Sequence, residues 1–258
     1  MIGMFPTAAR WIERGRGEPV VFLHGLMGDK DHWETTLEAL EPVCRALAPD
    51  LPIFDAAQAD ASIEGLADYV HRFMRALQID RAVLGGNSLG GHLALELALA
   101  RPECVAGLIL TGSSGLFERG FTRGVPHVPT TEFVRAKMQE VFYDPGLVTP
   151  AWVESVRRVL VTRPYAVRLV HVARSAKRSN LEARLAGVQV PTLLVWGKDD
   201  RITPVETAER FRALISDAEL VTIANCGHAP MLEQPLMFNA IVEDWLIDSR
   251  AYRVRGAR

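Results

Sequence analysis

Residues 86–91 carry the pattern of a nucleophilic serine on a sharp turn. They read G-N-S-L-G-G, so Ser88 has a glycine two positions before it and two positions after it. A strand-like run over 82–84 precedes the segment and a helical pattern over 89–100 follows it. On so tight a turn, side chains at the two glycine positions would collide with neighbouring backbone. The free N–H groups at the N-terminus of the following helix would stabilise an oxyanion that develops there. We therefore predict that Ser88 is a nucleophile.

A serine hydroxyl is a poor nucleophile near neutral pH and needs a base. Among the seven histidines, we predict His228, which ends the segment N-C-G-H. This segment follows the last strand-like run, at the carboxyl edge where open α/β sheets place their sites. His24 follows the first strand-like run and is expected to orient a loop. His92 lies four residues after Ser88 and is expected to point along its helix.

The base needs an acid that holds its orientation. Residues 196–204, W-G-K-D-D-R-I-T-P, follow a buried strand-like run and precede a helix. Asp199 and Asp200 therefore both fall at the same sheet edge as the serine and the histidine. We predict Asp200 as the acid and keep Asp199 as the alternative, with Glu118 as a more remote one. The chain order serine, aspartate, histidine is typical of enzymes with this nucleophile turn.

A second loop supplies the remaining chemistry. Residues 24–28, H-G-L-M-G, follow the first strand-like run. The backbone N–H of Leu26 and that of Leu89, directly after the nucleophile, are predicted to form an oxyanion hole. Two such donors stabilise a tetrahedral oxyanion, and losing one typically costs roughly 3 kcal/mol.

The elements that must position these residues alternate along the chain. Short runs rich in Val, Ile and Leu predict strands that are buried on both faces of a parallel sheet, at 20–23, 82–84, 105–110, 192–196 and 220–223. Helical spacing lies between several of them, over 63–77 with Ser62 as N-cap, and over 89–100, 205–215 and 237–247. Strand and helix in alternation indicate an α/β fold with a mostly parallel sheet flanked by helices.

One region breaks this alternation. From 114 to 187 no strand is evident, and helices are predicted over 132–142, 151–161, 164–176 and 180–186, the second with Thr149 as N-cap. We interpret 114–187 as a helical insertion that caps the sheet, and 1–113 together with 188–258 as the core domain.

Composition limits the function classes. The chain has 258 residues, 29 Lys and Arg against 31 Asp and Glu, and a net charge of −2. This balance argues against a nucleic-acid binder. No apolar run of about 18 residues predicts a membrane span, and charged residues interrupt the N-terminal segment where a signal peptide would be apolar. The three cysteines are widely spaced, which favours a reducing cytoplasm over a disulfide framework or a zinc site. The oligomeric state stays open.

With these motifs in order, the chain resembles the α/β-hydrolase-fold serine hydrolases from about Trp11 to Leu246. The resemblance rests on H-G-L-M-G, G-N-S-L-G-G, W-G-K-D-D-R-I-T-P and N-C-G-H. It implies a helical cap after the strand that follows the nucleophile helix, and no metal or organic cofactor. In relatives the acid is the second residue of the D-D pair, which supports Asp200. Related dehalogenases and epoxide hydrolases carry an aspartate as the nucleophile. The serine at position 88 argues against both of these activities.

Within this family the motifs are similar to hydrolases of ring meta-cleavage products, which break a carbon–carbon bond. The resemblance implies that Asn87 helps to bind substrate and that a cap arginine, matched by Arg163, holds a substrate carboxylate. The sequence also departs from that pattern. Ala229 stands where those enzymes carry a tryptophan after the catalytic histidine, residues 112–115 replace a more glycine-rich loop, and the glycines usual after D-L-P are missing at 50–55.

Basic residues dominate the second half of the insertion. Over 151–186 there are eight, against only Glu154 and Glu182: Arg157, Arg158, Arg163, Arg168, Arg174, Lys177, Arg178 and Arg184. Such a cap is able to focus the field over a cleft and attract an anionic substrate. The alternative is an ordinary set of solvated helix faces.

The sequence thus predicts a serine hydrolase that cleaves a small to medium carboxylic ester through an acyl-enzyme on Ser88, His228 and Asp200. Carbon–carbon hydrolysis of meta-cleavage products is the alternative among enzymes. A low-turnover sensor of a small ligand is the alternative of another class, and it would differ by completing very few cycles per molecule, against about 1 per second or faster for an enzyme. In each case the partner is a small molecule.

Overall fold

A seven-stranded sheet forms the centre of the molecule in the order β1-β3-β2-β4-β5-β6-β7. The computed structural model describes residues 10–55, 60–116 and 128–248, so Glu118, the remote candidate acid, lies outside the described residues. β1 pairs antiparallel with β3, and the other neighbours pair parallel. The strands are β1 Trp11–Arg14, β2 Pro19–Leu23, β3 Arg45–Pro49, β4 Ala82–Asn87, β5 Val105–Thr111, β6 Thr192–Gly197 and β7 Ala218–Ile223.

Helices cover both faces of this sheet, which is why its strands lack polar alternation. Every residue of β4, β5 and β6 is buried. In β2, Val21 and Leu23 pack into the core beneath α2 Ile63–Ala76, α3 Leu89–Ala100 and α7 Val205–Leu214. Val20 and Phe22 pack into the core on the other face with α1 Glu34–Leu40 and α9 Pro235–Asp248. The predicted α/β fold class is confirmed.

Side-chain caps fix where several helices begin. The Ser62 hydroxyl accepts a hydrogen bond of 3.1 Å from the N–H of Gly65 at the start of α2, as the sequence predicts. Thr149 does the same for the N–H of Trp152 at 3.2 Å in α5 Pro150–Val161, where Pro150 occupies the first helical position.

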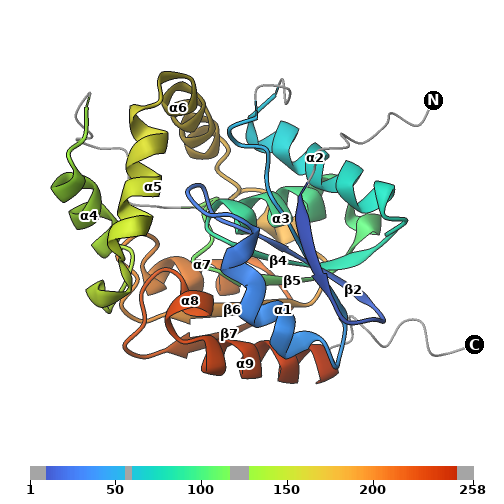
Figure 1. Cartoon of the computed structure of the whole chain (residues 1–258). Coiled ribbons are helices and arrows are strands. Elements are labelled where there is room, and N and C mark those ends of the chain that lie inside the picture. The colour runs from blue at the N-terminus through green and yellow to red at the C-terminus, as the bar shows by residue number, and fades with distance from the viewer. Residues whose placement is uncertain (1–9, 56–59, 117–127, 249–258) are drawn as a thin grey trace, which may run out of the picture.

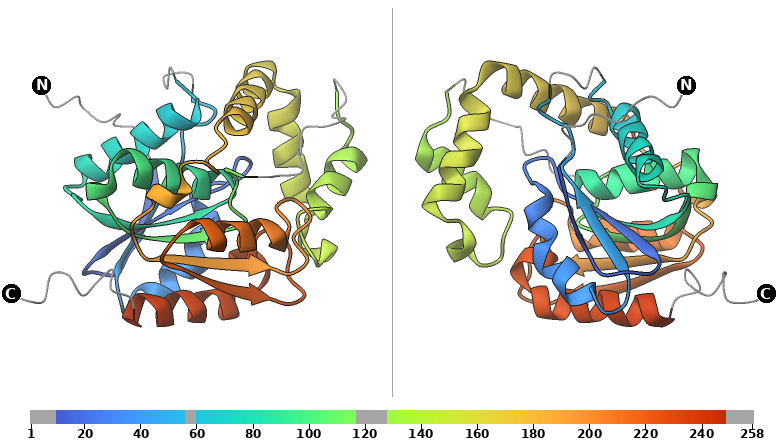
Figure 2. Two further views of the ribbon diagram at one scale, coloured as in Figure 1. Left: turned by 180° about the vertical axis from the view of Figure 1, so that it is seen from behind. Right: turned by 45° about the vertical axis from the view of Figure 1, so that its right-hand side comes forward.

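Three further helices and four short 3₁₀ helices complete the described elements. The helices are α4 Thr131–Gln139, α6 Arg163–Arg178 and α8 Pro230–Glu233; the 3₁₀ helices are Lys30–Trp33, Pro102–Cys104, Pro145–Leu147 and Leu185–Gly187. Helices α4, α5 and α6 fall between β5 and β6 in the chain and lie together beside the sheet in Figures 1 and 2. Within the described ranges, no helix is long and apolar enough to cross a membrane.

Two predicted helices differ from the structure. The helix expected over 180–186 is a turn that ends in a 3₁₀ helix, and the N–H of Leu181 donates to the carbonyl of Gly115 at 2.8 Å. The helix expected over 132–142 ends at Gln139, and the carbonyl of Val141 accepts from the N–H of His228 at 2.8 Å. Both segments bond to distant parts of the chain, which the local pattern does not indicate.

Candidate active site

Ser88 stands on the turn that joins β4 to α3. Its backbone has φ 53° and ψ −114°, in the positive-φ region that residues with a side chain rarely adopt. A Cβ on Gly86 would lie 2.3 Å from the carbonyl carbon of Gly90, and a Cβ on Gly90 would lie 2.0 Å from the carbonyl oxygen of Leu23. The two glycines of G-x-S-x-G are therefore required by backbone contacts, which accounts for the motif.

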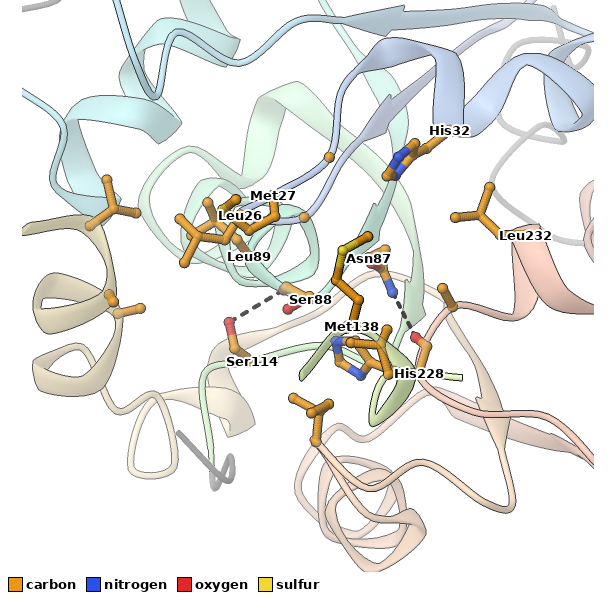
Figure 3. Close-up of a pocket in the computed structure, with 18 of the residues that line it drawn as sticks. Leu26, Met27, His32, Asn87, Ser88, Leu89, Ser114, Met138, His228 and Leu232 are labelled. Atoms are coloured by element: carbon orange, nitrogen blue, oxygen red, sulfur yellow. Dashed lines mark hydrogen bonds between the residues drawn. The ribbon is translucent and has the colours of Figure 1, made fainter. Parts of the chain in front are cut away.

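The segment after β5 holds this turn in place. The N–H of Ser88 donates to the carbonyl of Thr111 at 3.1 Å. The carbonyl of Ser88 accepts from the N–H of Ser114 at 3.1 Å and from the Ser114 hydroxyl at 3.3 Å, the bond drawn in Figure 3. The nucleophile turn is thus bonded to the neighbouring strand at both its N–H and its carbonyl.

His228 and Asp200 form a buried hydrogen-bonded pair. The Nδ1 of His228 lies 2.9 Å from Oδ2 of Asp200, and both side chains are almost wholly buried. Oδ1 of Asp200 accepts from the N–H groups of Ile202 and Thr203 at 2.8 and 2.9 Å. Burial acts to raise the pKa of Asp200, but the charge and hydrogen bond of His228 and the bonds from Thr203 outweigh it, so that pKa lies below its ordinary value. Asp199 is exposed.

Thr203 is part of this arrangement, although no motif in the sequence singled it out. Its fully buried hydroxyl donates to Oδ2 of Asp200 at 2.8 Å and lies 3.3 Å from Nδ1 of His228. The carbonyl of Thr203 in turn accepts from the indole N–H of Trp196 at 2.7 Å. The signal lay inside the segment W-G-K-D-D-R-I-T-P, whose threonine follows the acid by three positions.

Ser88 and His228 line one cavity of about 750 Å³. The Ser88 hydroxyl makes no hydrogen bond to any residue in the described ranges. Bonds between a nucleophile and its base are often long in unliganded enzymes and tighten once substrate is bound. Both side chains face the same space, which is the requirement for a proton to pass between them when a substrate is seated.

Asn87 lines the cavity, but its amide hydrogens are taken by the protein. The amide nitrogen donates to the carbonyl of Thr111 at 3.1 Å and to the carbonyl of His228 at 2.9 Å, the second of which is drawn in Figure 3. A side chain used in this way ties the base-carrying loop to the sheet. If Asn87 contacts a substrate, as the resemblance implies, the carbonyl oxygen of its amide is the atom that remains available.

The two predicted oxyanion donors lie close to the nucleophile. Leu26 and Leu89 are drawn beside Ser88 in Figure 3, and both line the cavity. In the described part of the chain, neither backbone N–H donates to another residue. The N–H of Leu26 and that of Leu89 are therefore free to bind an oxygen that develops charge at this point.

His24 fixes the loop that carries Leu26. Its Nδ1–H donates to the carbonyl of Gly25 at 2.8 Å, and its Nε2 accepts from the N–H of Leu51 at 2.9 Å. Burial lowers the pKa of His24 to about 4, so the ring is neutral at pH 7. This is the loop-orienting role that the sequence predicts.

His92 is placed away from the reacting groups and is not a cavity residue. It is buried, with Nδ1 3.4 Å from the Ser114 hydroxyl and Nε2 3.2 Å from the Ser179 hydroxyl. Its burial lowers the pKa to about 4. His92 thus connects the nucleophile helix to the segment after α6.

The insertion supplies much of the cavity wall, and that wall is apolar. From α4 to α6 the lining residues are Met138, Val141, Phe142, Trp152, Val156, Val172, Ala173, Ala176 and Lys177. From the core, Met27, Leu116, Ile202, Met231 and Leu232 add further apolar contacts. A substrate therefore meets the nucleophile beneath a predominantly hydrophobic enclosure.

The structure does not bring Arg163, the predicted carboxylate ligand, into the cavity. Arg163 begins α6 and is exposed, and the cavity-facing residues of that helix start at Val172. Val172 lies nine residues, about 13 Å, further along the helix axis than Arg163, so Arg163 stands before the segment of α6 that lines the cavity. The cation that lines the cavity is Lys177, which the sequence pattern did not distinguish from its basic neighbours.

Glu233 is a second residue that no motif indicated. One carboxylate oxygen accepts from the N–H of Tyr143 at 2.5 Å, and the other accepts from the N–H of Gly227 at 2.6 Å, next to His228. Glu233 therefore joins the insertion to the base-carrying loop. Its only sequence signal is a glutamate five positions after the histidine.

The described residues contain no cluster of three or more His, Cys, Asp or Glu side chains that would hold a metal ion.

A family model described as "Alpha/beta hydrolase family" matches residues 20–241.

Similar chains include hydrolases of dienoic acids and an esterase. The chain is 32% identical over 251 residues to the 2-hydroxy-6-oxo-2,4-heptadienoate hydrolase of Pseudomonas putida, covering 90% of each. It is 30% identical to the 2-hydroxy-6-oxo-6-phenylhexa-2,4-dienoate hydrolase of Burkholderia cepacia, covering 91% of this chain and 89% of that one. A thermophilic esterase from Thermogutta terrifontis aligns with a TM-score of 0.77 at 25% identity over 93% of both chains.

Proposed function

Because the chain belongs to the alpha/beta hydrolase family, we propose that it hydrolyses small to medium carboxylic esters through an acyl-enzyme. The observation that carries the proposal is that His228, held 2.9 Å from the buried Asp200, lines the same largely apolar cavity as Ser88. A base held in this way is suited to activate a serine hydroxyl, and apolar walls suit the acyl chain of an ester.

In the first half of the reaction, the Ser88 hydroxyl attacks the ester carbonyl carbon while His228 takes its proton. The carbonyl oxygen becomes negative, and the N–H groups of Leu26 and Leu89 donate to it. Asp200 stabilises the imidazolium that forms and keeps Nδ1 as its donor. His228 then gives its proton to the alkoxy oxygen as the bond to the carbonyl carbon breaks, and the alcohol leaves.

In the second half, water attacks the acyl-enzyme and gives a proton to His228. The same donors bind the second oxyanion. As the tetrahedral intermediate collapses, His228 returns the proton to Ser88, the bond from serine to the acyl carbon breaks, and the carboxylic acid is released. No group outside the described residues is needed for this cycle.

Carbon–carbon hydrolysis of a dienoic acid is the second candidate, favoured by the two relatives at 32% and 30% identity. One feature argues for the ester: Ala229 lines the cavity with a small side chain where the resemblance to the meta-cleavage hydrolases implies a tryptophan.

The deciding experiment is steady-state kinetics on a short p-nitrophenyl ester and on a phenyl-substituted meta-cleavage product, with Ser88→Ala as control. Faster ester turnover, lost by at least about 10³-fold in the variant, supports the proposal. Faster cleavage of the dienoic acid would overturn it in favour of the second candidate. Absence of multiple turnovers on both would favour a ligand sensor.

We also propose a cytoplasmic location. The support is chemical: the three cysteines, Cys44, Cys104 and Cys226, are widely spaced in the chain and are all buried. A compartment that keeps thiols reduced is the usual home of such a set.

A further inference from the structure

Lys177 differs from every other described residue that lines the cavity. The remaining lining residues include no other lysine, no arginine and no carboxylate. A single cation in an otherwise apolar enclosure makes that enclosure electrostatically one-sided, because no neighbouring lining group offsets its charge.

The position of Lys177 follows from the phase of α6. Val172, Ala173 and Ala176 face the cavity, and Lys177 follows Ala173 by one helical turn on the same face. The side chain is exposed at the end of α6, so it belongs to the rim of the cavity. There its aliphatic stem is able to lie on the apolar wall while the ammonium group meets whatever enters.

Three further basic residues of the described part of the insertion bond to other parts of the protein. Arg157 pairs with Glu154 at 2.9 Å, and Arg184 pairs with Glu96 at 2.7 Å. The guanidinium of Arg168 donates to the carbonyl of Ile53 at 2.8 Å. None of these lines the cavity, whereas Lys177 does and has no ion pair with any residue that the structure describes. The basic character noted in the sequence thus reaches the cavity through one side chain.

The arrangement around Ser88 indicates which end of a substrate Lys177 would meet. In Figure 3 helix α6 lies on the side of Ser88 away from His228. His228 protonates the leaving alcohol in the proposed reaction, so the alcohol occupies the His228 side. The acyl chain then extends toward α6.

We infer that Lys177 binds an anionic group at the far end of the acyl chain, so that the preferred substrates are half-esters of dicarboxylic acids or esters of similarly charged acyl groups. The inference rests on the proposed ester hydrolysis and adds the substrate class. An exposed ion pair is weak because water screens it, so the expected preference is about fivefold in kcat/KM.

The test uses the monomethyl esters of linear dicarboxylic acids from succinate to suberate, each paired with its neutral dimethyl ester. The measured quantity is the ratio of kcat/KM for the charged ester to that for the neutral ester, corrected for the two ester groups of the latter. The wild type should favour the charged ester at one or two chain lengths, and added salt should reduce the ratio.

Variants of α6 isolate the cation. Lys177→Met should lower the ratio about fivefold and Lys177→Glu further, while Lys177→Arg should retain most of it. Arg174→Met is the matched control, because Arg174 is exposed on the same helix outside the cavity and its loss should leave the ratio unchanged.

One outcome would overturn the role of Lys177 alone, and another would overturn the proposed ester hydrolysis. Ser88-dependent ester hydrolysis with the same ratio in wild type and Lys177→Met at every chain length would overturn the inference and leave the proposed function standing. Failure of every ester in the series to turn over would overturn the proposed function, and the inference with it.

Discussion

The sheet and the insertion contribute to one cavity in different ways. On the sheet side, the positions of the reacting groups are set by close backbone contacts and buried hydrogen bonds, as at Gly90 and Asp200. On the insertion side, the lining is mostly apolar side chains, and the helices join the rest of the molecule through a few polar contacts such as Glu233 with Tyr143 and Arg184 with Glu96. The comparison indicates that the sheet specifies the chemistry and the insertion specifies the substrate.

The strongest test of this division is Asp200→Asn against Asp199→Asn. We expect the first to lower kcat by about 10³- to 10⁴-fold, because it removes the charge that orients and stabilises the imidazolium. The exposed Asp199 is the matched control, and its variant should keep near-normal activity. Equal losses in both variants would contradict the choice of acid. Circular dichroism and thermal unfolding establish that both remain folded.

A second test concerns pH and the contacts of His92 with both regions. A histidine whose folded pKa is lowered to about 4 binds its proton more weakly in the folded state than in the unfolded state, which titrates near 6.5. Stability should therefore be full above about pH 6.5 and fall as the pH is lowered toward 4. Each such histidine contributes a slope of about 1.4 kcal/mol per pH unit in that window. His24, with the same lowered pKa, adds to the slope.

Urea unfolding between pH 4.5 and 7.5 measures this slope. His92→Asn should lower the slope of the free energy of unfolding against pH by about 1.4 kcal/mol per pH unit, the contribution of one proton. His171→Asn, a change at an exposed position of α6, should leave that slope unaltered. An unchanged slope in His92→Asn would show that His92 is not one of the groups responsible.

Glu233→Gln probes the junction between the two regions. A glutamine amide has one acceptor oxygen, so it accepts from only one of the N–H groups of Tyr143 and Gly227 and turns its own NH2 toward the other. The free energy of unfolding should therefore fall by about 1–3 kcal/mol. We expect kcat to fall with it, because Gly227 precedes the base. A loss of stability with kcat unchanged would mean that the junction does not position His228.

The smallest effect is expected from Thr203→Val, which keeps the shape of the side chain and removes the hydroxyl bond to Asp200. We expect kcat to fall by about fivefold, consistent with one buried hydrogen bond of about 1 kcal/mol. Steady-state kinetics of both proteins on the same ester measure the effect, and an unchanged kcat would contradict a role for the hydroxyl in holding Asp200.

What the sequence predicts well is local in the chain. The turn at Ser88 requires glycines at fixed spacing, and the segments around Asp200 and His228 lie directly after continuous apolar runs, so spacing alone indicates them. β3 escaped prediction because R-A-L-A-P is short and alanine-rich, although its last four residues are buried.

What the sequence did not predict depends on orientation and distance. Arg163 and Lys177 are fourteen residues apart on nearly the same face of α6, and only the position of the cavity along the helix axis, beside Val172 to Lys177, separates them. Glu233 acts on Tyr143, 90 positions away, and nothing at either site signals the other. The amide of Asn87 could equally have faced a substrate, and the carbonyl of His228 takes it instead.

The contact between Gly90 and the carbonyl of Leu23 has a consequence for how the site works. Helix α3, which begins at Leu89, touches the end of β2, from which the loop carrying Leu26 departs. The two proposed oxyanion donors are therefore built on segments in direct backbone contact, with no side chain between them to rotate or compress. Their relative position is established when the chain folds, so a reacting carbonyl meets donors that need no rearrangement during the reaction.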